Sequence, residues 1–451
     1  MNRRSVIALI TFIPLVSWGV RTDAEEMRQV NAYYFGNSFL ENSMPGLHGG
    51  LGKSAGKEWN VTASIYAGIP IWCHMNYLTV KPRIDDLNKF NAAAPKCDTI
   101  VMLIYGGHGL SHVSKGYWGM EFPQPTDIGD INACATIIDM FLKHNPNGRA
   151  FIYTAWPGIP EAASFRKRVK DEVAAGARAQ GLSREETLKL VKERKPTHAE
   201  MEPIRQRFDY AEEWMTGDYI PESATVEQRD RLQKYATALR LNPKTNPKPS
   251  TTIAGLAEAT GIAEATVAAD LSAVRIAEKD LTAADIATRV GQYVNEWPHT
   301  HSRAHMWAVM EGLKKRYPAM WQEGRLGIIP HGDVFLALDK KMRAGQVPGV
   351  VNVGEYSTDG GHIRAGLPRY TLAATCYAVL FRDNPNHLDW KLMADRDDYV
   401  KDEKGLNKVG GVYTHIPDLG EVLEITPERA KAVNDTIWEV VQNHPYTQVS
   451  K

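Results

Sequence analysis

Short apolar runs alternate with helical periodicity over the first third of the chain. A strand covered on both faces of a parallel sheet needs no polar positions, so such runs indicate buried strands. The runs lie at Val30–Phe35, Thr99–Tyr105 and Arg149–Trp156. Between the last two, apolar positions from Ile131 to Leu142 keep the spacing of one helix face, and Asn145-Pro-Asn-Gly ends that helix. Strand, helix and strand in succession predict a parallel sheet with helices on both faces.

The pattern changes after this region and later resumes. From about residue 161 to 290 there is no convincing strand, Arg, Lys and Glu crowd the first half, and Leu241–Ser250 has the composition of a linker. The later elements are a helix from Met306 to Leu313, a strand at Leu326–Pro330 and an apolar helix at Tyr370–Phe381. Thr426-Pro427-Glu428 places an N-cap residue, a proline and an acid where a final amphipathic helix would begin.

These patterns predict one α/β domain interrupted by a large helical insertion. The expected boundaries are residues 25–160 and 296–451 for the two parts of the domain and 161–295 for the insertion. The architecture that fits is a three-layer α/β/α, flavodoxin-like parallel sheet.

The first residues are typical of an export signal and not of the fold. Arg3 and Arg4 precede the apolar run Val6–Val16, which is too short to span a bilayer, and the polar Arg21–Ala24 follows. We expect a signal peptide at residues 1–24 and a periplasmic or extracellular location in a bacterium. Cleavage after either Gly19 or Ala24 fits, the export route stays open, and a buried N-terminal strand is the alternative. No later stretch is apolar enough for stable membrane insertion after cleavage.

Composition and net charge argue against some classes of protein. The chain has 451 residues, with 53 Lys plus Arg against 53 Asp plus Glu, so no net charge favours nucleic acid as a partner. Four cysteines are too few for a disulfide framework in a chain of this length. Cys134 and Cys376 fall on apolar helical faces and are expected in the core, whereas the spacing leaves a Cys73–Cys97 pair open.

Two short motifs carry candidate chemistry. Ligands of parallel α/β sheets bind outside the carboxyl ends of the strands, and Gly36-Asn37-Ser38 stands directly after the first predicted strand. A free serine is a weak nucleophile and needs a base, which in turn needs an orienting acid. Far along the chain, Asp359 and His362 are separated by two glycines, which allow the carboxylate to reach one imidazole nitrogen while the other faces outward.

In these two blocks the chain resembles the SGNH hydrolase superfamily, the GDSL-type esterases. The resemblance covers roughly residues 28–160 and 296–381, and excludes the insertion. It implies that Ser38 is the nucleophile, His362 the general base and then acid, and Asp359 the residue that orients His362.

The oxyanion donors of that family are matched less well. The resemblance implies that the N–H of Gly68 joins that of Ser38, but the family's third donor, an Asn side chain, has no counterpart in Tyr105-Gly106-Gly107-His108-Gly109. Either His108 or a backbone N–H, such as that of Gly107, substitutes, or the site is altered. One such donor typically stabilises the transition state by about 2.7 to 4 kcal/mol.

The insertion leaves the predicted sheet at a strand exit, so its two ends should lie beside the cleft. Asn37, Trp156, Trp297 and His299 are therefore expected at the cleft edge. A packing or oligomerisation module is the alternative role for the insertion.

Two further patterns suggest other functions but fit them poorly. His299, His301 and His305 lie within seven positions, yet no carboxylate accompanies them in a metal-binding pattern, and we expect neither a metal nor a cofactor. Residues 253–271 resemble a helix-turn-helix, but the second helix has almost no basic side chains to contact DNA. A small helical packing unit explains this segment better.

Together these features predict an exported serine ester hydrolase. The resemblance and the export signal favour removal of an O-acyl group, such as acetyl, from a small-molecule or polysaccharide ester. The alternative is a catalytically degenerate carbohydrate-binding or scaffold protein on the same fold.

Overall fold

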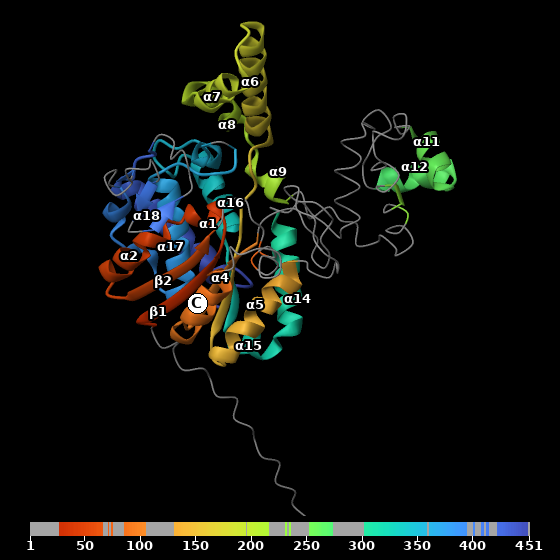
Figure 1. Ribbon diagram of the computed structural model, residues 1–451. Helices are drawn as coiled ribbons and strands as arrows, with labels where there is room; N and C mark the ends of the chain where they lie inside the picture. Colours follow the sequence, from red (N-terminus) through yellow and green to blue (C-terminus); the bar gives the residue numbers. More distant parts are fainter. Residues whose placement is uncertain are drawn as a thin grey trace, which may run out of the picture.

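A five-stranded parallel sheet with the order β2-β1-β3-β4-β5 forms the centre of the computed structural model (Figure 1). The model describes residues 27–65, 71, 74, 85–104, 130–194, 196–215, 231, 234–235, 252–273, 302–358, 360–394, 400–401, 407–409, 412–414 and 422–449. The strands are β1 (Gln29–Gly36), β2 (Glu58–Ile65), β3 (Thr99–Leu103), β4 (Arg149–Tyr153) and β5 (Leu326–Ile329). Every neighbouring pair in this sheet is parallel, which confirms the predicted α/β class.

Burial explains which strands can be predicted from hydrophobic runs in the sequence. Every residue of β3, β4 and β5 is buried, so these strands are wholly apolar or nearly so, as strands covered on both faces are. β2 lies at an edge of the sheet and only Trp59 and Ser64 on it are buried. Hydrophobic runs alone therefore do not mark β2.

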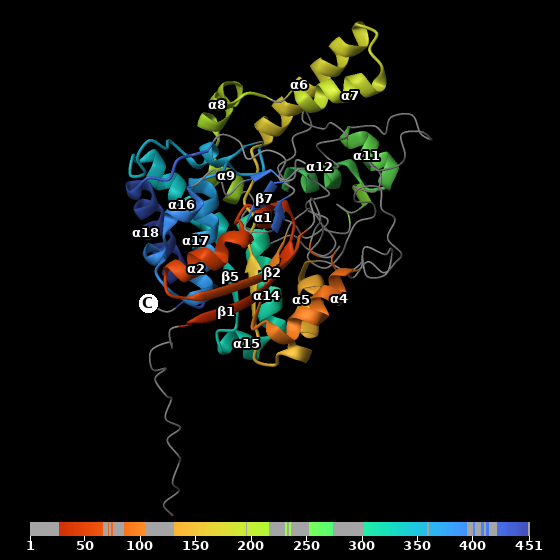
Figure 2. The same ribbon diagram turned by 60° about the vertical axis from the view of Figure 1, so that its left-hand side comes forward.

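Helices flank both faces of the sheet, an arrangement compatible with a three-layer α/β/α fold (Figures 1 and 2). On one side α2 packs against β2 and α17 packs against β1 and β5. On the other side α4 packs against β2, α5 against β3 and α14 against β5. These helices and their neighbours are α1 (Ser38–Glu41), α2 (His48–Ser54), α4 (Asp85–Ala93), α5 (Asp130–His144), α14 (Arg303–Arg316), α15 (Pro318–Gln322), α16 (His331–Arg343), α17 (Leu367–Phe381) and α18 (Pro427–Asn443).

Helix α17 is buried along its whole length, because the sheet lies on one side of it and α16 and α18 pack against the others. Its continuous apolar sequence follows from that position. Helix α18 is amphipathic and begins as predicted: the side chain of Thr426 caps it by accepting the N–H of Arg429, and Pro427 is its first residue.

The described residues between β4 and β5 contain helices and no strand. These helices are α6 (Pro160–Ala179), α7 (Arg184–Glu193), α8 (His198–Arg207), α9 (Tyr210–Met215), α11 (Ile253–Thr260) and α12 (Glu264–Ala273), together with α14 and α15. Helices α6 and α7 pair and project away from the sheet (Figure 2). In contrast, Phe208, Tyr210 and Trp214 are buried in the main core, and a Cβ atom on Gly332 would lie 2.1 Å from the ring of Trp214. This part of the insertion is therefore structurally part of the α/β domain.

Residues 253–271, which resemble a helix-turn-helix in sequence, lie in the two helices α11 and α12, which pack against each other. Gly261 joins them with a φ of +67°, a left-handed conformation that favours glycine. On α12 the buried carboxylate of Asp270 accepts two hydrogen bonds from Arg231, at 2.7 and 2.9 Å, and one from the hydroxyl of Tyr235 at 2.9 Å. The carboxylate of Asp270 is thus paired with side chains from elsewhere in the insertion.

Three short antiparallel strands make a second sheet, β6 (Val400–Lys401), β7 (Asn407–Val409) and β8 (Val412–Thr414). Within the described ranges, no helix has both the length and the apolar character needed to cross a bilayer. The expected signal peptide lies outside those ranges. Cys97, Cys134 and Cys376 are buried free thiols, so Cys134 and Cys376 occupy the core as predicted. Cys73, the other half of the pair that the sequence leaves open, lies outside the described ranges.

Two fully buried histidines stand at the start of helices, His48 in α2 and His331 in α16. His48 donates from Nε2 to the carbonyl of Ser43 at 2.7 Å and stacks on Trp59, and Nε2 of His331 lies 3.2 Å from the carbonyl of Leu372. Burial penalises the charged imidazole and lowers the pKa of each histidine from 6.5 to about 3. Both side chains are therefore neutral in the folded protein near pH 7.

This burial predicts that stability falls on acidification. Between pH 6.5 and about 3 the unfolded chain protonates His48 while the folded chain does not, so lowering the pH favours unfolding. In the His48→Gln variant the free energy of unfolding should therefore depend less on pH, by up to about 1.4 kcal/mol per pH unit. Chemical denaturation of both proteins at pH 4 to 7 measures it; parallel curves of unfolding free energy against pH would contradict the assignment.

Candidate active site

Ser38 is the first residue of α1 and stands directly after β1. Gly36 makes the tight strand-to-helix turn possible, because a Cβ atom there would lie 2.8 Å from Cβ of Leu40. Asn37 is the N-cap, and its side-chain oxygen accepts the backbone N–H of Phe39 at 2.9 Å. The turn thus fixes the position of the serine at the carboxyl end of the sheet.

The side chains of Ser38 and His362 lie within hydrogen-bonding distance. Ser38 Oγ is 2.8 Å from His362 Nε2, although the two residues are 324 positions apart in the sequence. Both side chains are half-buried. A hydroxyl at this distance from an imidazole nitrogen can pass its proton to it, which is the first requirement for a serine nucleophile.

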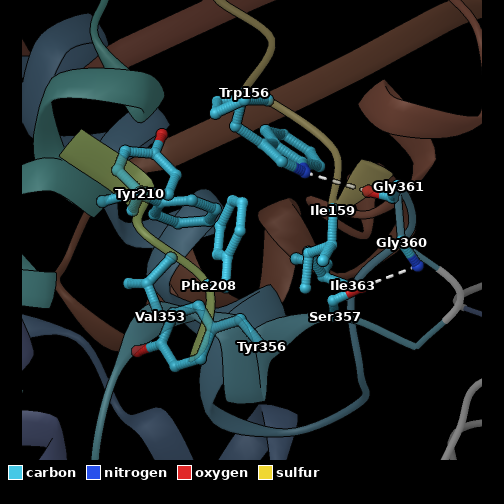
Figure 3. Close-up of a pocket in the computed structure, with 12 residues that line it drawn as sticks. Trp156, Ile159, Phe208, Tyr210, Val353, Tyr356, Ser357, Gly360, Gly361 and Ile363 are labelled. Carbon is cyan, nitrogen blue, oxygen red and sulfur yellow. Dashed lines mark hydrogen bonds between the residues drawn. The ribbon is translucent and has the colours of Figure 1, made fainter. Parts of the chain in front are cut away.

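Two aromatic rings wall this pair. The ring of Phe39 meets the imidazole of His362 edge-on, with 5.6 Å between centroids, and lies 4.8 Å from the ring of Trp156. Trp156 Nε1 donates to the carbonyl of Gly361 at 3.0 Å (Figure 3). The residue before the histidine is therefore tied to the end of β4.

The structure corrects the expected role of two cleft-edge residues. Asn37 is 1% exposed, because its amide is turned inward to cap α1. Trp156 is 3% exposed, because its ring packs between Phe39 and Phe335. Asn37 thus supports the site from within, and Trp156 is also one wall of the pocket beside Gly360 and Gly361.

Buried groups beneath α1 hold the helix against the sheet. The hydroxyl of Tyr153, at the end of β4, donates to the carbonyl of Phe39 at 3.4 Å, and Ser43 Oγ donates to the carbonyl of Leu40 at 2.8 Å. Burial raises the pKa of Tyr153 well above 10, so its hydroxyl stays protonated and keeps donating.

Other predicted site residues fall outside the described ranges. They are Gly68, Gly107, His108, Trp297, His299 and Asp359. The structure therefore brings together Ser38, His362, Asn37 and Trp156, while the expectations for the oxyanion donors and the orienting acid remain predictions.

His305, from the histidine cluster considered for metal binding, has a structural partner instead. Its Nε2 lies 3.0 Å from Asp130 Oδ2, and both side chains are almost completely buried between α5 and α14. Burial raises the pKa of Asp130. In the part of the chain that the structure describes, no group of three or more His, Cys, Asp or Glu side chains is arranged to hold a metal ion.

Three residues near Ser38 and His362 are not predicted from the sequence. His74 is buried and places Nε2 3.2 Å from the carbonyl of Gly36, Phe39 contacts the imidazole, and Arg205 reaches the loop that carries His362. For Phe39, an aromatic residue directly after the serine is a weak signal in the sequence. No motif in the sequence marks His74 or Arg205.

Comparison with known proteins adds little to this geometry. No family model matches the chain, and no curated protein matches it. Among solved structures, a DUF4886 family protein from Bacteroides uniformis matches with a TM-score of 0.36 and 9% identity, over 92% of this chain and 95% of that chain. A likeness this distant supports no inference about function.

The cap at Asn37 gives a test of how the serine is held. Asn37→Ala leaves the N–H of Phe39 without its acceptor and should lower the free energy of unfolding by about 0.5 to 2 kcal/mol, whereas Asn37→Ser, which can still cap, should lose less. Urea denaturation of the three proteins makes the comparison. Equal losses in both variants would show that capping is not what the side chain contributes.

Proposed function

We propose that the chain is a serine-dependent ester hydrolase of the SGNH type, with Ser38 as nucleophile and His362 as its base. The 2.8 Å approach of Ser38 Oγ to His362 Nε2 carries this proposal. Two motifs that are unremarkable alone meet at one point, and a nucleophile in contact with a base is the arrangement that acyl transfer requires.

The strand order supports placing a substrate there. The chain passes from β1 to β2 on one side and then crosses to β3 on the other, so the order reverses at β1, as in flavodoxin-like sheets. Crevices at such a point, outside the carboxyl ends of the strands, are where open α/β sheets bind ligands. Ser38 follows β1 at this location.

The proposed reaction has two halves. Ser38 Oγ attacks the ester carbonyl carbon while His362 Nε2 takes the hydroxyl proton, which forms a tetrahedral oxyanion. Collapse of that intermediate breaks the bond to the alkoxy oxygen, and His362 returns the proton to the leaving alcohol. Water then attacks the acyl-serine, with His362 again accepting and returning a proton, and releases the carboxylic acid.

Other groups complete the proposed mechanism. The N–H of Ser38, as the first in a helix, has no acceptor within that helix and is suited to the oxyanion. Asp359 is assigned to hold the imidazole orientation, and the N–H of Gly68 to be a second oxyanion donor, both from the SGNH resemblance. We further propose export of the mature protein and an O-acylated carbohydrate as substrate, from the signal-like N-terminus and the same resemblance.

A fluorophosphonate probe and a small activated ester test the nucleophile. The wild type should react with the probe and hydrolyse 4-nitrophenyl acetate, and Ser38→Ala should abolish labelling and lower turnover by about 10⁴-fold or more. Ser54→Ala, which changes an exposed serine of α2, is the control and should behave as wild type. A wild type that neither labels nor turns over would favour a degenerate binding protein on this fold.

The hydrogen-bonded pair should also act as a unit. His362→Ala should lower turnover of the same ester about as severely as Ser38→Ala, and the double variant should be no slower than the single ones, because neither group is effective without the other. Steady-state rates of the three variants decide this. Losses that multiply in the double variant would show that the two residues work independently.

A further inference from the structure

His362 lies at the tip of a short hairpin. Ser357 and Ile363 form an antiparallel bridge, and the N–H of Arg364 donates to the carbonyl of Tyr356 at 2.7 Å. At the tip, the backbone N–H of Thr358 donates to the carbonyl of His362 at 2.8 Å. The direction of the imidazole therefore depends on how this hairpin is held.

Side chains and backbone from outside the hairpin hold three of its carbonyls. The carbonyl of Gly360 accepts the N–H of Ile159 at 2.5 Å, and that of Gly361 accepts Trp156 Nε1 at 3.0 Å. Both donors follow β4. The third carbonyl, of Thr358, accepts a guanidinium N–H of Arg205 at 3.2 Å, and Arg205 belongs to α8 in the insertion. Thr358 directly precedes Asp359 in the sequence.

Packing against the hairpin is incomplete on this side. A small pocket, with room for no more than about one water molecule, lies beside Gly360 and Gly361 (Figure 3). Its other walls are mainly apolar and aromatic, formed by Trp156, Pro157, Ile159, Phe208, Tyr210, Phe335, Val353, Tyr356, Ser357 and Ile363. Gly360 has a φ of +97° and lacks a side chain that could fill the space. The directed hydrogen bonds therefore add to the restraint that packing gives.

Arg205 is itself held rigidly. The residue is 3% exposed, and its backbone carbonyl approaches the 3-10 helix η5 (Val353–Tyr356) so closely that a Cβ atom on Gly354 would lie 2.3 Å from it. The carbonyl of Gln206 accepts Asn352 Nδ2 at 3.0 Å, and the carbonyl of Phe208 accepts a guanidinium N–H of Arg343 at 2.6 Å. The position of α8 is thus transmitted to the hairpin through a buried side chain.

We propose that Arg205 is a positioning residue, through which the helical insertion sets the alignment of His362 with Ser38. The proposal rests on the proposed esterase function. Arg205 binds a backbone carbonyl of the hairpin, so its loss should impair proton transfer more than the binding of a small ester. The insertion would then be part of the catalytic apparatus as well as an addition to the surface.

Arg205→Met and Arg205→Lys test this, with Arg207→Met as the matched control. Arg207 is exposed on the same helix and pairs with exposed Glu161. Kinetics with 4-nitrophenyl acetate, normalised to sites labelled by a fluorophosphonate, should show kcat per site lowered about ten- to a hundredfold in Arg205→Met with KM nearly unchanged. Arg205→Lys should recover part of the loss, because lysine can still donate to the carbonyl, and Arg207→Met should match wild type.

The outcomes separate the two proposals. A wild type that is not labelled at Ser38 removes the esterase function, and the role of Arg205 with it. An active wild type with unchanged kcat per labelled site in both Arg205 variants overturns the positioning role alone, since a purely structural residue changes only the amount of folded enzyme. If Arg205→Met does not fold by circular dichroism, Arg205→Lys decides: lowered kcat per site supports the proposal, and wild-type kcat refutes it.

Discussion

Parallel strand pairing is the constraint on which the rest of the structure depends. All five strands of the central sheet run the same way, so their carboxyl ends lie at the same end of the sheet. The chain must therefore leave from that end after each strand to reach the start of the next one. Ser38 follows β1 there, and Trp156 follows β4. The hairpin that carries His362 comes from a later part of the chain, but hydrogen bonds from Trp156 and Ile159 hold it at the same end of the sheet.

The hairpin also shows how a polar loop can be partly buried. Removing its carbonyls from water without partners would cost free energy. Those of Thr358, Gly360, Gly361 and His362 all accept hydrogen bonds. Glycine at 158, in the segment after β4, lets the hairpin backbone come close, because a Cβ atom there would lie 2.6 Å from the carbonyl oxygen of Gly360. The same contacts that satisfy the loop therefore hold the imidazole in place.

Sequence patterns predict the parts of this structure that follow local rules. Wholly buried strands such as β3 and β5 are apolar or nearly so, and Thr426 caps α18 through its own hydroxyl, so both can be recognised without the fold. Arg205 cannot, because it lies in a helix rich in charge and is buried only by the way that helix meets η5. Asn37 is intermediate: asparagine is typical of an N-cap, but the helix it caps has four residues, too few to show periodicity.

The pairing of β4 with β5 has a consequence for how the chain folds. Residues that are neighbours in the sheet, such as Tyr153 and Ile329, are separated in sequence by the whole insertion, so their pairing closes a very large loop. Contacts of such high sequence separation slow folding, because chain entropy is lost before the contacts form. Ser38 and His362, 324 positions apart, come from the parts of the chain before and after that loop. A folding intermediate with β1 to β3 already paired would therefore have Ser38 in its turn but without His362 beside it.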